Sequence, residues 1–145
     1  MYTISNVSND FVKCKDEQAF KKLYCNKYLK VTSRMLSTQK VMCIETEETI
    51  AGFPDVIELM TYKQNTTIKF FEFKISDARG DIKFQPSQPA FYKNNQELSI
   101  SVIAYNRLSQ RVHVFSTNEI FDKHSPYYSA SGRISLTNAE KEIGV

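Results

Sequence analysis

The sequence predicts an α/β fold, a three-layer α/β/α sandwich with a central mixed β-sheet. Segments with the apolar spacing of a helix are interspersed with segments of alternating or β-branched residues, the pattern of helices packed on a sheet. The chain of 145 residues is long enough for one hydrophobic core and short for two. Its 41% apolar, 12% aromatic and 24% charged residues are typical of a globular protein. We therefore expect one domain over residues 1–145.

A helix is expected first, starting at Ser8 or Asp16 and ending near Leu29. Phe20 and Tyr24 recur at the helical period, and Asp16 adds negative charge at the beginning of the helix, where the helix dipole favours it.

Strands are expected next. Residues 30–38 and 40–45 are rich in β-branched and apolar residues without a helical period. Residues 55–62 and 67–76 form a second pair, and the polar residues 63–66 between them have the length of a hairpin connector.

A second helix is expected over residues 88–98, with Ser87 as its N-cap and Pro89 in its first turn. Strands follow over residues 99–106 and 110–117. The remaining expectations are a short helix that Thr117 or Asn118 caps and that ends near Lys123, and no clear element after residue 125.

Charge and cysteine content narrow the function classes. The 19 Lys and Arg residues exceed the 16 Asp and Glu residues by three, which permits binding to a polyanion without requiring it. The three cysteines have neither the number of a disulfide framework nor the spacing of a zinc site. The sequence has no apolar run of membrane-spanning length and no secretory signal pattern at its start. We expect a cytoplasmic protein without a membrane partner.

Three ionisable side chains fall on the expected hairpin. Asp55 follows Pro54 at the head of the first strand, and Glu72 and Lys74 lie two residues apart on the second. Because side chains alternate across a strand, Glu72 and Lys74 share one face while Phe73 takes the other. Two ionisable groups on one face of so apolar a strand favour a functional role over a solvent-facing pair.

The expected hairpin register brings these groups together. If residues 63–66 centre the turn, Asp55 lies opposite Lys74 and diagonal to Glu72, with α-carbons roughly 7 to 8 Å apart. Two carboxylates and the main-chain carbonyl of Phe73 are suitable ligands for Mg²⁺ or Mn²⁺. Lys74 is then placed to orient a water molecule and to stabilise a phosphate transition state.

The segments GFPD (52–55) and EFK (72–74) resemble the two halves of the PD-(D/E)xK motif of the restriction-endonuclease-like nuclease superfamily. The resemblance implies that fold, Asp55 and Glu72 as metal ligands, and Lys74 as the catalytic lysine. Glu17 is similar to the additional upstream acid of many members, and it is also half of an i, i+4 pair with Lys21. The other candidates for this acid are Glu45, Glu47 and Glu48.

Two further positions extend the resemblance. Ser76 and Gln88 resemble the pattern of archaeal Holliday-junction resolvases and of virus-type replication-repair nucleases. Gln88 and Tyr92 also resemble the QxxxY element of RecB-like nucleases, with Gln85 as the alternative to Gln88. The resemblance covers residues 16–121.

The expected function is therefore metal-dependent cleavage of DNA phosphodiester bonds, with branched DNA as the first choice of substrate and a homodimer making paired cuts. Recombination, repair or phage replication would suit such an enzyme. The alternatives are an RNA-cleaving or restriction-type relative and a non-catalytic nucleic-acid binder. Contacts to nucleic acid are expected from five residues, Ser76, Arg79, Lys83, Tyr92 and Lys93, although the charged ones also suit a solvated loop and the tyrosine suits packing.

Overall fold

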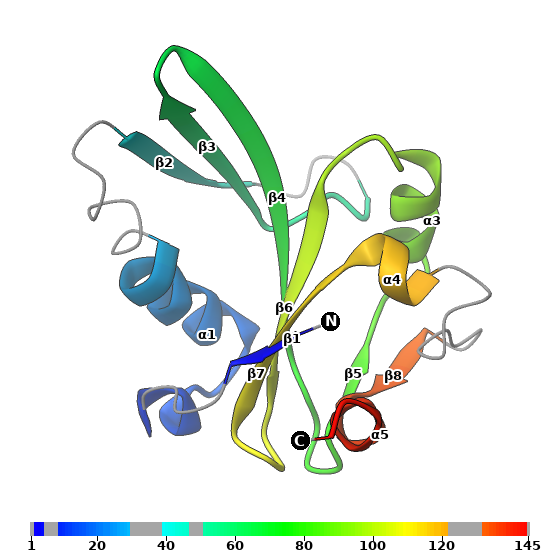
Figure 1. Ribbon diagram of the computed structural model, residues 1–145. Coiled ribbons are helices and arrows are strands. Elements are labelled where there is room, and N and C mark those ends of the chain that lie inside the picture. Colours follow the sequence, from blue (N-terminus) through cyan, green and yellow to red (C-terminus); the bar gives the residue numbers. More distant parts are fainter. Residues whose placement is uncertain (1, 5–8, 30–38, 47–50, 122–131, 145) are drawn as a thin grey trace.

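A computed structural model describes residues 2–4, 9–29, 39–46, 51–121 and 132–144. These residues form a mixed α/β domain in which helices cover both faces of a mixed sheet (Figure 1). The strands are β1 (Tyr2–Ile4), β2 (Gln39–Glu45), β3 (Val56–Tyr62), β4 (Asn65–Ile75), β5 (Asp81–Lys83), β6 (Ile100–Asn106), β7 (Arg111–Ser116) and β8 (Arg133–Ser135). The α-helices are α1 (Glu17–Tyr24), α3 (Ser87–Asn94), α4 (Thr117–Phe121) and α5 (Leu136–Glu142).

The central sheet has the strand order β1-β7-β6-β4-β3-β2. Strands β4 and β6 are parallel, and all other neighbours in this sheet are antiparallel. Helix α3 lies in the connection between the two parallel strands, as a crossover requires. The expected mixed sheet is confirmed.

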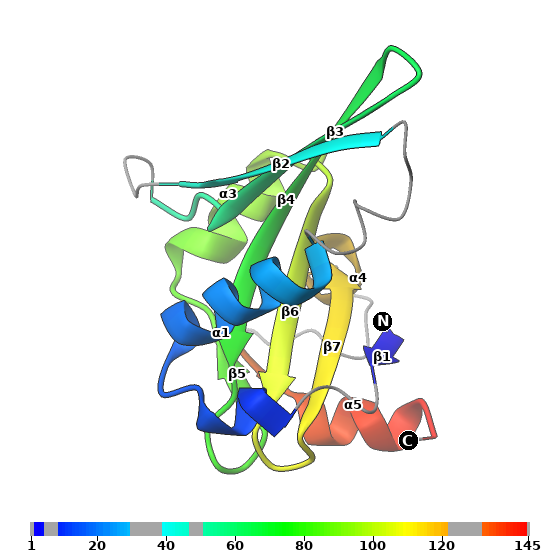
Figure 2. The ribbon, with the colours of Figure 1, turned by 90° about the vertical axis from the view of Figure 1, so that its left-hand side faces the viewer.

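Helix α1 forms as the sequence predicts. The Asp16 side chain accepts a hydrogen bond from the Ala19 N–H at 2.9 Å and caps the first turn. Phe20 and Tyr24 are buried against the sheet, and the chain continues as a π-helical turn over Cys25–Leu29. Figure 2 shows α1 lying across β4 and β6.

The expected hairpin register is wrong by two residues. The turn consists of Lys63 and Gln64 alone, both with positive φ (47° and 69°), as a two-residue type I′ turn requires. Val56 therefore pairs with Phe71, and Asp55, one residue ahead of β3, lies level with Glu72 rather than with Lys74. A shift of two residues preserves the side-chain faces, so the predicted grouping of the acids survives.

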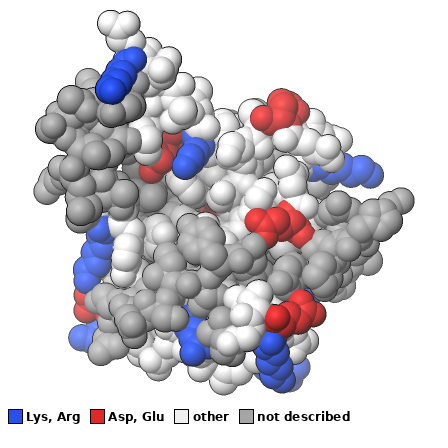
Figure 3. All heavy atoms as spheres, in the orientation of Figure 1, with Lys and Arg blue, Asp and Glu red and all other residues white. Residues whose placement is uncertain are grey.

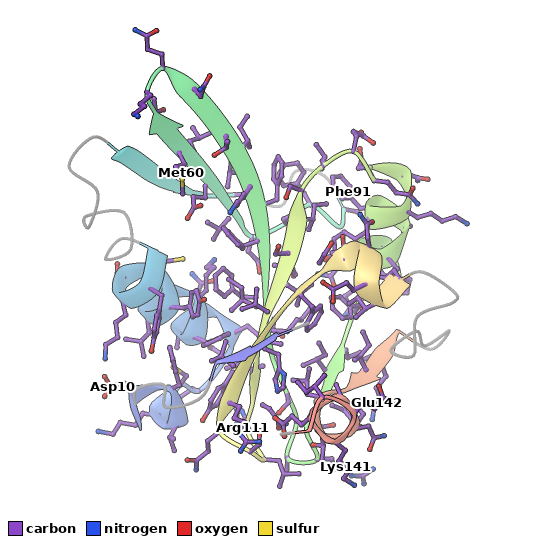
Figure 4. All side chains as sticks on the ribbon, in the orientation of Figure 1. Asp10, Met60, Phe91, Arg111, Lys141 and Glu142 are labelled. Carbon is purple, nitrogen blue, oxygen red and sulfur yellow. The ribbon has the colours of Figure 1, made fainter. Side chains whose placement is uncertain are left out.

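Two clusters of apolar side chains fill the spaces on either side of the sheet (Figure 4). Phe71 and Phe73 of β4 pack under α1 with Phe20. Phe70 faces the opposite cluster, which includes Phe84 and lies between the sheet and α3, α4 and α5. Glu72 and Lys74 share the Phe70 side, as predicted.

The second half differs from the expectations at the helix after residue 86 and in the elements after residue 131. The helix over Ser87–Asn94 stops before residue 98, and Ser87 is its first residue rather than its N-cap. β5 pairs with β8 in a separate two-stranded sheet, and α5 follows, although no element was expected after residue 125. The strand expected over 30–38 lies outside the described residues.

Candidate active site

The candidate site lies where β3 and β4 stop pairing. β3 begins at Val56, whereas β4 continues to Ile75. The Ser76 amide donates to a carbonyl of β6. Because the backbone groups of successive residues point to opposite edges of a strand, those of Phe73 and Ile75 point away from β6. At this edge no strand among the described residues pairs with them.

Two carboxylates occupy the open edge. The Phe73 N–H donates to Asp55 Oδ2 at 3.0 Å, and the Ile75 backbone hydrogen-bonds to the Glu17 carboxylate. The Phe73 carbonyl lies between these two amides along the strand, so the two acids flank it. Asp55 comes from the loop ahead of β3, and Glu17 from the first turn of α1.

On the α3 side of β4, Gln88 holds Glu72 and Lys74 together. Its Nε2 donates to Glu72 Oε1 at 2.6 Å, and its Oε1 accepts from Lys74 Nζ at 3.0 Å. The same Oε1 accepts from the Gln85 N–H at 2.8 Å, which fixes the side chain at the start of α3. Lys74 Nζ also lies 3.9 Å from Glu72 Oε1 and 4.9 Å from the centre of the Phe84 ring. All three polar side chains are buried.

The loop that carries Asp55 is anchored to α3. The Phe53 ring contacts Phe91 at a centroid distance of 5.5 Å. Gly52 has φ +85°, and a Cβ built on it would lie 2.2 Å from the Ser87 carbonyl oxygen. Only glycine allows so close an approach in this backbone conformation. The anchor therefore positions Asp55 relative to Gln88.

The acids influence one another electrostatically. Burial raises the pKa of Glu72 to about 8, and the negative charge of Asp55 adds to the rise, as does that of Glu17 more weakly. Lys74 and the Gln88 hydrogen bond oppose it. Glu72 is therefore sensitive to every other charged group of the site.

Glu17 is an exposed residue, yet its carboxylate hydrogen-bonds to the Ile75 backbone of β4. Partial burial raises its pKa, against the attraction of Lys74 and the hydrogen bond from Ile75, and the charge of Asp55 adds to the rise. Glu17 therefore interacts electrostatically with Asp55, Glu72 and Lys74.

The donor set fits a divalent cation. Glu72 Oε2 is buried without a hydrogen-bond partner, and an uncompensated carboxylate oxygen in this position is costly. Carboxylate and carbonyl oxygens are the ligands that Mg²⁺ prefers. Among the described residues no three His, Cys, Asp or Glu side chains form a ready metal cage. Mg²⁺ commonly uses one or two carboxylates with water and phosphate, so the two observations agree.

A hollow of about 460 Å³ opens beside the acids on the α1 side. Its walls are Asp16, Glu17, Gln18, Lys21, Asp55 and Ile75. The site thus has a buried part, with Glu72, Lys74 and Gln88, and an open part that a solute can enter.

The other predicted contact residues are placed differently. The Ser76 hydroxyl is buried, donating to the Asp77 carbonyl at 2.8 Å and accepting from the Arg107 N–H at 2.8 Å. Tyr92 is 2% exposed and packs against Phe121, so its ring cannot stack on a base as predicted.

The three charged contact residues are exposed. Lys83 ends β5, Lys93 lies in the last turn of α3, and Arg79 lies in the β4–β5 turn, where its carbonyl accepts from Thr137 of α5. None of them lines the hollow.

Of the four candidates for the upstream acid, Glu17 is the one whose side chain the structure describes, and its carboxylate hydrogen-bonds to the Ile75 backbone of β4. Glu47 and Glu48 lie outside the described residues, and the Glu45 side chain is likewise not described. Sequence reasoning missed the Gly52 anchor and the position of Lys21 in the lining of the hollow. Gly52, directly before the Phe-Pro-Asp segment, was a usable signal for the anchor.

On the face drawn in Figure 3, basic and acidic side chains are interspersed rather than gathered into one basic field. Within the described ranges, every helix is too short or too polar to cross a bilayer.

No known protein family, curated protein or solved structure matches the chain.

Proposed function

We propose that this protein is a metal-dependent endodeoxyribonuclease with a restriction-endonuclease-like fold. The observation that carries the proposal is the meeting of Glu17, Asp55 and Glu72 with Lys74 at the open edge of β4. These groups come from a helix, a loop and a strand. The pKa of Glu72 is raised by its burial and by the charges of Asp55 and Glu17, and groups with such perturbed pKa values cluster at functional sites.

Asp55, Glu72 and the Phe73 carbonyl would hold the cation, which in the proposed enzyme is Mg²⁺ or Mn²⁺, and Glu17 would be the additional acid beside them. When bound, it supplies charge neutralisation at a phosphate and a lowered pKa for water. The anchored loop and the Phe73 N–H keep Asp55 in place before the substrate arrives.

Lys74 would act on the phosphate. Gln88 and the Phe84 ring hold its ammonium beside Glu72, so it loses little side-chain freedom when a substrate binds. A cation held in a water-poor position stabilises the charge that builds up on a phosphate in the transition state. The same ammonium can orient the attacking water.

DNA is the proposed substrate, branched DNA above all. A single domain of 145 residues favours recognition of shape and backbone over recognition of base sequence, and its net charge of +3 permits contact with a polyanion. Two copies would allow paired cuts on the two strands of a junction.

The test is cleavage of labelled four-way junction, duplex, single-stranded DNA and RNA with Mg²⁺ or Mn²⁺. We expect the wild type to cut DNA, and Asp55→Asn and Lys74→Met to lower the rate at least about 100-fold. Glu58→Gln is the matched control, because Glu58 is a buried acid on β3 outside the site. It should cut at the wild-type rate.

The proposal fails if the wild type cuts no substrate with either metal, or if Asp55→Asn and Lys74→Met cut as fast as the wild type. Cutting of RNA alone would move the protein to the RNA-cleaving alternative. Binding without cutting would make it a nucleic-acid-binding module.

A further inference from the structure

The open part of the site contains one basic side chain among its six lining residues. Lys21 lies one helical turn after Glu17 on α1 and lines the hollow with Asp16 and Asp55. The helix lies across the sheet (Figure 2). Four residues at its beginning, Asp16, Glu17, Gln18 and Lys21, line the hollow. A phosphate that enters the hollow meets three carboxylates and this single ammonium.

Lys21 forms no ion pair with any of these acids. Its side chain is only 8% exposed, yet no ion pair or hydrogen bond joins it to a residue that the structure describes. An i, i+4 pair with Glu17 is geometrically available but is not formed, because the Glu17 carboxylate turns to the Ile75 backbone. A lysine can bury its aliphatic stem while its ammonium reaches solvent, where an anion that enters the hollow can pair with it.

Lys74 cannot fill this role in the hollow. It lies on the opposite side of β4, 5% exposed, bonded to Gln88 and packed on the Phe84 ring. The two lysines therefore belong to different sides of β4, Lys74 to the enclosed α3 side and Lys21 to the hollow on the α1 side.

We infer that Lys21 is a phosphate-binding residue that holds the DNA backbone in the hollow. This rests on the proposed function, because it names how the same site takes hold of its substrate. Lys21 offsets the repulsion between the lining acids and an incoming phosphodiester, so it contributes to affinity. No hydrogen bond or ion pair joins Lys21 to Glu72 or Lys74, the groups proposed to act in the reaction. We therefore expect kcat, the rate at saturating DNA, to be independent of Lys21.

The test is fluorescence anisotropy of labelled junction and duplex DNA in EDTA, where no cutting occurs, over a salt series from about 50 to about 200 mM. We expect Lys21→Met to weaken binding roughly tenfold and to lower the slope of log affinity against log salt by about 0.9. Lys21→Arg should keep both. Lys22→Met is the matched control, since Lys22 is the exposed neighbour on the same helix.

Folding is controlled separately. Lys21→Gln is the second variant if Lys21→Met unfolds, and the salt slope decides, because lowered stability reduces the active fraction without changing the number of ions released. In Mg²⁺, Lys21→Met should raise KM and leave kcat within about twofold.

The inference is overturned if the Lys21 variants keep the wild-type affinity and salt slope, if Lys22→Met loses as much, or if the protein binds RNA and not DNA. The two proposals can fail separately. If DNA binding depends on Lys21 but no substrate is cut, the proposed nuclease activity is wrong and the phosphate contact stands. If DNA is cut and neither binding nor cutting depends on Lys21, only this inference is wrong.

Discussion

Glu72 and Lys74 lie 3.9 Å apart on one buried face of β4, measured from Oε1 to Nζ, and the Gln88 amide bonds to both. At that distance Glu72 and Lys74 form an ion pair but no direct hydrogen bond. The amide satisfies one carboxylate oxygen and the ammonium together, and it leaves the second carboxylate oxygen of Glu72 unpartnered. The Gln88 hydrogen bonds thus fix Glu72 Oε1 and Lys74 Nζ, while Glu72 Oε2 has no hydrogen-bond partner and can accept a ligand.

Gln88→Ala should destabilise the protein by about 1 to 3 kcal/mol, because Glu72 and Lys74 each lose a buried partner. Urea unfolding measures the change. Gln85→Ala is the matched control, since the exposed Gln85 contributes its backbone N–H and not its side chain. A loss below about 0.5 kcal/mol for Gln88→Ala would contradict this interpretation.

Metal-free protein should lose stability as the pH rises from 4.5 toward about 8, because the folded pKa of Glu72 is raised above its ordinary 4.5. Below that window the carboxyl is protonated in both states. Within it the folded protein keeps a proton that the unfolded chain has released, so the free energy of unfolding falls with rising pH. Above the window the loss is complete.

Glu72→Gln should flatten this slope. Urea unfolding in metal-free buffer across the window, for the wild type, Glu72→Gln and the exposed acid variant Glu97→Gln, provides the measurement. Identical slopes for the wild type and Glu72→Gln would show that this carboxyl is not the group responsible.

Gly52→Ala should destabilise the protein by more than about 2 kcal/mol, because the substitution combines a left-handed backbone with a Cβ 2.2 Å from the Ser87 carbonyl oxygen. It should also lower cutting by displacing Asp55. Gly144→Ala separates the two causes, since Gly144 has φ +77° with nothing within 4 Å of an added Cβ. Thermal unfolding of both variants should show the larger loss for Gly52→Ala, and equal losses would remove the anchor from the explanation.

Glu140→Ala should release α5 from the sheet. The Glu140 carboxylate accepts hydrogen bonds from Asn106 Nδ2 at 3.1 Å and from Ser109 Oγ, and pairs with His113 Nε2 at 2.7 Å, all at or near the β6–β7 turn. Removing it takes a hydrogen-bond partner from two fully buried polar side chains, Asn106 and His113, with an expected loss of about 3 kcal/mol in the free energy of unfolding. Glu142→Ala, exposed on the same helix, should lose little. Hydrogen exchange in α5 that is unchanged in Glu140→Ala would contradict the role assigned to this network.

The sequence by itself determined the local features. Alternation placed Glu72 and Lys74 on one face of β4 and Phe73 on the other, and Asp16 marked the start of α1, because these properties depend only on backbone geometry and near neighbours. The order of helices and strands could be predicted because hydrophobic periodicity is also a local property of the sequence.

Only the tertiary structure decided which distant groups meet. The two-residue turn at Lys63 and Gln64 has no glycine to announce it, so the hairpin register came from packing. Strand pairing of β5 with β8 and the contact of Glu17 with Ile75 join segments about 50 residues apart or more, which no local pattern encodes. The position of Lys21 beside the acids also depends on tertiary packing. The burial of Phe20 and Tyr24 determines how α1 lies on the sheet, and therefore which of its residues line the hollow.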